Sequence, residues 1–295
     1  MRTRTTLLCA FLLGLAAASA YADDVYTING GGQFGSVNLS TGTFTPIGPG
    51  LPEGTDGLVA GPGGNLLTVG GSGNLYSINP FTGVAITIGN TGLTPSTEPV
   101  NSLGGLNGSV YALDANNSLY SVNTATGVAT LIGSTGMPGD PGCGNFPNLC
   151  DEAMFSYNGN LYATYDAWLV GPDGYTTTIL DNPALWEIDP TTAAATFVAS
   201  TGLRILSLAE DNGSVVGFEG FPSATNPLPN PLVEAINLDP TNGNTSEIVS
   251  LGTDTGPMFG VAPETAAAPE PASLALLGTS LAAVAARLRY TRLRR

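Results

Sequence analysis

Residues Leu75–Gly89, with the sequence LYSINPFTGVAITIG, decide the fold. Tyr76 and Ile78 share one face of a short strand, because successive side chains of a strand point to opposite sides. The residues NPFTG then reverse the chain, since Pro80 presets φ and Gly83 can take the left-handed conformation without steric cost. Apolar side chains alternate again in the residues that follow. The stretch therefore predicts a β-hairpin.

The same pattern occurs five times along the chain. The copies are separated by 41, 44, 66 and 48 residues and begin at Phe34, Leu75, Leu119, Leu185 and Val233. A second, weaker hairpin precedes most copies, with turns such as Asn107-Gly108 and Asn158-Gly159 that suit tight hairpins. Each unit then has four antiparallel strands. Four-stranded units at a period in the forties predict an all-β fold, a β-propeller.

The two ends of the repeat region predict how the ring closes. One strand, Val25–Ile28, precedes the first copy, and one apolar segment, Met258–Val261, follows the last. Together they would complete a fifth blade with the C-terminal strand innermost. We therefore expect five blades of four strands. The alternative is six blades, with a degenerate blade between Trp168 and Ile179 in the longest interval.

The N-terminal segment predicts export. Arg2 and Arg4 precede an apolar run from Leu7 to Ala18, and small-x-small sites end at Ala20 and Ala22. This order is typical of a secretory signal peptide. We expect residues 1–22 to form a signal helix that is removed after Ala22, or after Ala20. The alternative is an uncleaved N-terminal anchor, although the run is shorter than the roughly 20 residues of a membrane span.

The C-terminal segment has three parts. Pro269-Glu270-Pro271 is followed by Ala272–Ala286, which carries no charge and predicts a hydrophobic helix. Residues 287–295 close the chain with a basic cluster formed by Arg287, Arg289, Arg292, Arg294 and Arg295. Such clusters stay on the cytoplasmic side of a membrane, so the body before them would lie outside. We therefore expect residues 265–295 to be a linker and a membrane-anchoring tail.

The tail resembles the PEP-CTERM sorting signal of Gram-negative, exopolysaccharide-producing bacteria. The resemblance covers residues 269–295 and rests on the tripeptide Pro269-Glu270-Pro271, the apolar run and the closing arginines. It implies that an exosortase recognises and removes the tail, after transient anchoring in the inner membrane, and that the protein ends at the outer surface or outside the cell. The repeat pattern also resembles extracellular repeat regions of other PEP-CTERM proteins. The alternative is an ordinary C-terminal anchor.

Composition excludes several functions of the body, residues 23–264. It carries 22 acidic residues and one basic residue, Arg204, so its net charge is −21. Such a charge repels phosphate backbones, and we expect no binding of nucleic acid. The chain has no histidine and no lysine, which excludes His-based triads, His-ligated zinc and Schiff-base lysines. We expect no cofactor and no enzymatic activity.

Two cysteines remain in the exported body. In an oxidising compartment Cys143 and Cys150 predict a disulfide that closes a short loop and stabilises the fold by about 2.5 kcal/mol. A metal site would need more ligands than these two residues supply.

Acidic residues recur in the segments that enter the expected innermost strands. In a propeller these segments surround one mouth of the central channel, where a ring of carboxylates with one arginine could bind a cation such as Ca²⁺ or a polyhydroxy ligand such as a sugar. The alternative is a set of solvated loop residues in an acidic chain. The candidates are Glu53, Asp56, Glu98, Asp151, Glu152, Arg204 and Asp254.

Three functions are compatible with this sequence. The first is a non-enzymatic surface or matrix protein displayed in exopolysaccharide or biofilm, which the tail, the repeats and the missing catalytic residues favour. The second is a glycan-active enzyme, which would need two carboxylates about 5–9.5 Å apart in the channel mouth. The third is a lectin-like carbohydrate binder.

Overall fold

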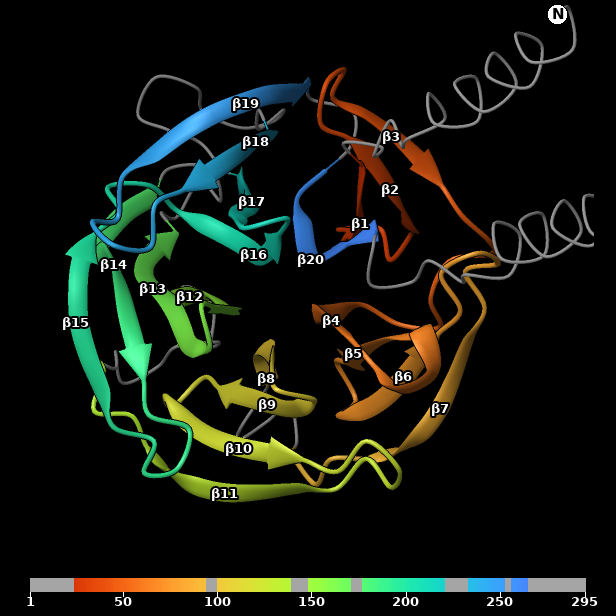
Figure 1. Cartoon of the computed structure of the whole chain (residues 1–295), viewed down its shortest axis with the longest axis horizontal. Helices are drawn as coiled ribbons and strands as arrows, with labels where there is room; N and C mark the ends of the chain where they lie inside the picture. The colour runs from red at the N-terminus through yellow and green to blue at the C-terminus, as the bar shows by residue number, and fades with distance from the viewer. Residues whose placement is uncertain are drawn as a thin grey trace, which may run out of the picture.

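The fold is a five-bladed β-propeller, as the repeats predict. The computed structural model describes residues 24–93, 100–138, 148–170, 177–220, 233–252 and 256–264, without side chains at 100–101, 148–152, 167–170 and 177–182. In this part, five four-stranded antiparallel sheets stand around a central axis (Figure 1). One 3₁₀ turn, η1 (Pro62–Gly64), interrupts the strands. Among the described residues no helix has the length and apolar character to cross a membrane, and both expected terminal helices lie outside these residues.

The blades are numbered in ring order, and their strands are given from the channel outward. Blade 1 contains β20 (Met258–Pro263), β1 (Asp24–Asn29), β2 (Phe34–Asn38) and β3 (Thr43–Pro46). Blade 2 contains β4 (Thr55–Ala60), β5 (Leu66–Gly70), β6 (Asn74–Ile78) and β7 (Ala85–Asn90). Blade 3 contains β8 (Val100–Leu106), β9 (Ser109–Asp114), β10 (Ser118–Val122) and β11 (Ala129–Ser134). Blade 4 contains β12 (Asn148–Tyr157), β13 (Asn160–Val170), β14 (Thr177–Ile188) and β15 (Ala195–Ser200). Blade 5 contains β16 (Ile205–Asp211), β17 (Ser214–Gly220), β18 (Val233–Leu238) and β19 (Thr245–Gly252).

Blade 1 is assembled from both ends of the described chain. Strand β20 pairs antiparallel with β1, and Val25 lies opposite Pro263. The Gly30 amide extends the contact by donating to the Pro257 carbonyl at 2.7 Å. The expected closure, with the C-terminal strand innermost, is confirmed (Figure 1).

The six-bladed alternative is wrong. The long interval between the third and fourth copies extends β13 and β14, which remain neighbours in one sheet. Trp168 and Ile179, the proposed limits of a hidden blade, are direct cross-strand partners. The inserted residues therefore lengthen one hairpin of blade 4.

The repeated LYxI pattern makes both faces of a blade apolar. In blade 2, Leu75 packs into the cluster shared with blade 3, whereas Ile78 packs into the cluster shared with blade 1. Leu119 and Leu185 likewise face the next blade of the ring. Five such clusters fill the five interfaces between blades. The core of this protein is thus divided among the interfaces.

The turn between the two outer strands of a blade rests on the outer strand of the preceding blade or on the residues that directly follow it. A Cβ atom on Gly83 would overlap the carbonyl oxygen of Ile47, and one on Gly127 would lie 2.7 Å from the carbonyl carbon of Gly89. Both glycines have positive φ, 65° and 83°. The equivalent residues of the other blades are Gly42, Ala193 and Gly243. We call these five contacts the perimeter clasps.

The clasp that contains Ala193 is wider than the others. Ala193 has φ 68° and is fully buried. A Cβ atom on its neighbour Gly133 would lie 3.3 Å from the Thr192 carbonyl oxygen, whereas one on Gly89 would overlap the equivalent oxygen of Thr126. This clasp therefore accommodates one methyl group.

Asparagine or aspartate begins each of these turns. The Oδ1 atom of Asn79 accepts hydrogen bonds from the amides of Phe81 and Thr82, at 3.0 and 3.1 Å. Asp239 accepts from the Thr241 amide at 2.9 Å in the same way. Side-chain acceptors at this position stabilise the turn by replacing backbone partners.

We predict that Gly83→Ala destabilises the protein more than Gly92→Ala. Both glycines have positive φ, so each substitution should cost about 1–2 kcal/mol for the left-handed alanine. Only Gly83 lies in a clasp, because a Cβ atom on Gly92 would meet nothing within 4 Å. The clasp should add about 1–3 kcal/mol for overpacking. Urea unfolding of the two variants measures the difference, and equal losses would contradict the role of the clasp.

Candidate functional site

The central channel has two different mouths. The tail-side mouth is the end at which the innermost strands finish, at Ala60, Leu106, Tyr157, Asp211 and Pro263. The far mouth is the opposite end, at which the same strands begin. The loops singled out from the sequence lead to the far mouth, so the two mouths have to be described separately.

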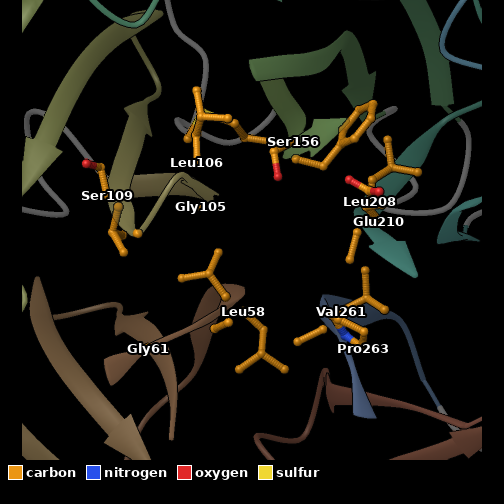
Figure 2. Close-up of a pocket in the computed structure, with 18 of the residues that line it drawn as sticks. Leu58, Gly61, Gly105, Leu106, Ser109, Ser156, Leu208, Glu210, Val261 and Pro263 are labelled. Carbon is orange, nitrogen blue, oxygen red and sulfur yellow. The ribbon is translucent and has the colours of Figure 1, made fainter. Parts of the chain in front are cut away.

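A cavity of about 680 Å³ opens at the tail-side mouth. All five innermost strands contribute to it, and Figure 2 shows their residues arranged around one opening. Leu58, Leu106, Met154, Leu208 and Val261 form most of its apolar wall. Each is at most 8% exposed, so these side chains are packed between the blades. A cavity of this volume is in the range of small-molecule sites.

Close packing of the innermost strands narrows the channel behind this cavity. A Cβ atom on Gly260 of β20 would lie 2.7 Å from the Cβ atom of Leu58 on β4, and one on Gly57 would lie 2.5 Å from the Leu103 amide nitrogen on β8. Only about 10 Å³ of space remains at this level, about the volume needed for a single water molecule. The cavity is therefore a cup that opens at the tail-side mouth and is narrow at its base.

Among the described residues that line the cup, Glu210 is the only carboxylate. It lies near the end of β16, next to Ser156 near the end of β12 on the adjoining blade (Figure 2). Within the described part of the chain, no hydrogen bond or ion pair reaches the Glu210 side chain. The polar part of the rim also includes Asn107, Ser109, Thr124 and Asn212.

Both described ends of the chain lie at the tail-side mouth. Val25 of β1 is opposite Pro263, so Asp24 and Glu264 are close to each other there. Burial raises the pKa of Glu264, and the charge of Asp24 raises it further. Burial, with the charges of the same two carboxylates, also raises the pKa of Tyr26 to about 12. The surroundings of this mouth are negative.

Glu53 has a structural role near the far mouth. Its carboxylate accepts hydrogen bonds from the Ser72 amide at 2.9 Å, from the Ser72 hydroxyl at 2.7 Å and from the Tyr76 hydroxyl at 2.5 Å. Burial raises the pKa of Glu53, but these hydrogen bonds outweigh it and hold the pKa below its ordinary value. The side chain thus ties the loop before β4 to the hairpin of β5 and β6.

Arg204, just before β16, pairs with Asp166 on β13, a residue that the sequence did not single out. The guanidinium Nε lies 3.9 Å from the Asp166 carboxylate, and the two side chains are 17% and 7% exposed. The pair therefore joins blade 4 to blade 5. Asp166 stands opposite Asp151 in the register, which no spacing in the sequence indicated.

The structure gives less detail for the other candidate site residues of the sequence analysis. Asp56 lies in β4 and is half-buried. Asp151, Glu152 and Cys150 lie inside β12, where only the backbone is described. Three further candidates fall outside the described residues: Glu98, Asp254 and Cys143. The expected acidic ring and disulfide therefore stay predictions, and no candidate lines the cup.

A second carboxylate group lies in blade 5. Glu219 on β17 is the direct cross-strand partner of Glu234 on β18. Because Phe218 packs toward blade 1, Glu219 points toward blade 4. Burial raises the pKa of Glu219 to about 7, with further contributions from Glu234 and Glu247. None of the three residues lines the cup.

These groups limit the chemistry of the described residues. No set of three or more Asp, Glu or Cys side chains is arranged to hold a metal ion in the part of the chain that the structure describes. The cup supplies one carboxylate, whereas glycoside hydrolysis uses two. Its geometry is that of an apolar binding cavity with a polar rim.

Comparison with known families identifies the tail. The model of the PEP-CTERM protein-sorting motif matches residues 267–289. The chain thus carries a recognition signal for exosortase processing, which indicates an exported protein that is transiently anchored in the membrane. The match begins four residues after the end of β20. No similar sequence is found among curated proteins.

Solved structures with a similar fold are distant in sequence. A protein of unknown function from Bacteroides thetaiotaomicron VPI-5482 is 14% identical, with a TM-score of 0.51, over 82% of this chain and 61% of that one. This chain therefore spans less than two thirds of its length. The PQQ-bound aldose sugar dehydrogenase from Streptomyces coelicolor is 15% identical, with a TM-score of 0.41, over 74% and 86%. At such identities the likeness concerns the fold alone.

We predict that Glu219→Gln stabilises the protein at high pH. Because the pKa of Glu219 is about 7 instead of 4.5, the folded state binds more protons than the unfolded state between these values, and stability falls as pH rises through them. The neutral variant should match the wild type near pH 4.5. It should be more stable at pH 8, on the order of 1 kcal/mol because the carboxyl is partly exposed.

Urea unfolding between pH 4.5 and 8 measures this effect. Glu187→Gln on β14 is the control for the loss of one negative charge. A stability difference between Glu219→Gln and the wild type that does not change with pH would contradict the prediction.

Proposed function

We propose that this protein is an exported propeller that acts without enzymatic activity, as a structural or binding component of an exopolysaccharide matrix at the cell surface. The observation that carries the proposal is the position of β20. This strand completes blade 1 and ends at Pro263, and the sorting motif begins at residue 267. Removal of the tail would therefore leave all five blades intact.

The length of the linker supports a defined orientation during sorting. Residues 265–271 are seven residues long and can span at most about 25 Å when extended. The tail-side mouth would therefore stay near the membrane while residues 272–286 are anchored in it. The far mouth, with Glu53 and Arg204, would face away. Cleavage would then release the tail-side mouth.

The composition of the body supports a non-enzymatic role. It has no histidine or lysine, and its cup offers a single carboxylate. An enzyme with a carboxylate pair is the alternative, and it would need the far mouth, where Asp56, Asp151 and Glu152 lie on innermost strands. Release of reducing sugar from the exopolysaccharide by the purified protein would favour this alternative.

We predict that Glu270→Gln impairs sorting, whereas Glu264→Gln does not. The first variant changes the Pro-Glu-Pro tripeptide, and the second removes the carboxylate nearest to it in the described chain. Immunoblots of membrane, periplasmic and matrix fractions should show uncleaved Glu270→Gln in the membrane. They should show processed wild type and Glu264→Gln in the matrix. Equal amounts of all three proteins in the matrix would contradict the proposal.

A further inference from the structure

The cup at the tail-side mouth combines an apolar interior with one negative group. Its walls are leucine, methionine and valine side chains, and Glu210 is its single carboxylate. We propose that the cup binds a small organic cation, whose apolar body fills the interior while its ammonium group meets Glu210. This inference rests on the binding role proposed above, and it adds a site and a class of ligand.

A positive charge that pairs with Glu210 has to come from a ligand and not from residues 23–264. Residues 23–264 contain one basic residue, Arg204. Arg204 pairs with Asp166 before β16, at the opposite end of the channel. Glu264 and Asp24 add negative charge at the tail-side mouth. The field at this opening therefore attracts cations.

A bare metal ion fits this cup poorly. Ca²⁺ takes six to eight oxygen ligands, most often from several carboxylates and carbonyls. The cup provides one carboxylate, and its other polar side chains, from Asn107, Ser109, Thr124, Ser156 and Asn212, are neutral and lie above an apolar wall. An organic cation needs one charged partner and gains from burial of its apolar part.

A sugar also fits poorly. Sugar sites commonly offer the face of an aromatic ring, together with several hydrogen-bonding side chains. Phe155 is the one aromatic residue of the lining, and it is 2% exposed because it packs between blades 4 and 5. The apolar interior would therefore offer no hydrogen-bond partners to the hydroxyl groups of a sugar.

The shape of the cup limits the length of the ligand. Gly57 and Gly260 let the innermost strands approach closely, and the channel narrows to about 10 Å³ of space at their level. The ligand can therefore enter only from the tail-side mouth and cannot thread through the ring. A short alkyl chain matches this depth better than an elongated polymer does.

The test compares three six-carbon probes, hexylammonium, hexan-1-ol and hexanoate, by calorimetric titration of the full chain at pH 7.5. We expect hexylammonium to bind most tightly and hexanoate least. Glu210→Gln should weaken hexylammonium binding about tenfold, the size of one charge-assisted hydrogen bond, and leave hexan-1-ol unchanged. Glu187→Gln, which removes the same charge from β14, should change neither.

A second variant tests the location of the site. Ala60 is exposed at the rim, so Ala60→Phe narrows the opening without entering the core, and it should weaken both hexylammonium and hexan-1-ol. Unchanged hexylammonium binding in Glu210→Gln, or unchanged binding of both probes in Ala60→Phe, would overturn the proposal. So would the absence of hexylammonium binding at millimolar concentration. Sorting is measured in cell fractions and ligand binding by calorimetry. The proposed function and the proposed binding site can therefore be contradicted independently.

Discussion

Each blade of this protein is apolar on both faces, and every other feature depends on how these faces are covered. An isolated four-stranded sheet of this kind would expose both apolar faces to water, at a cost of about 25 cal/mol per Å² of apolar surface. Closing five sheets into a ring gives each face a neighbour. Leu75 and Ile78, only three residues apart, serve two different interfaces for this reason. The ring has no apolar face without a partner blade, provided that β20 completes blade 1.

Close contact between blades has two sources, one at the perimeter and one at the axis. At the perimeter, Gly83 and its equivalents let a turn rest on the preceding blade. At the axis, Gly57 and Gly260 let innermost strands approach until the channel is almost closed. Glycine is needed at Gly57, Gly83 and Gly260 because a Cβ atom there would collide with a neighbouring blade, whereas the wider clasp of blade 4 accommodates Ala193. The cup at the tail-side mouth is the space that remains above this closure.

The sequence predicted most of the fold. The hairpin of residues 75–89 recurs with recognisable turns, so blade number, strand number and the closing strand follow from local chemistry. The six-bladed alternative arose because an insertion inside a hairpin and an added blade lengthen an interval equally. The five four-stranded sheets, and the pairing of Trp168 with Ile179 inside one of them, separate the two. The period of a repeat predicts its strands and turns, but it does not predict which structure an insertion adopts.

The site was less predictable than the fold. Acidic residues in loops were visible in the sequence, and they drew attention to the far mouth. The cup at the other mouth is made by ordinary strand residues, such as Leu58 and Leu208, whose arrangement exists only after five strands converge. Glu210 carries no local signal, because its importance comes from the apolar neighbours that other blades supply. The contact of Asp166 with Arg204 was hidden for the same reason.

Hydrogen exchange of the full chain tests ring closure most directly. If β20 and β1 complete blade 1, their amides should exchange only through global unfolding, with the same free energy as the amides of β9 and β10 in blade 3. Exchange of β20 and β1 through a local opening of lower free energy, while blade 3 stays protected, would contradict closure by the C-terminal strand.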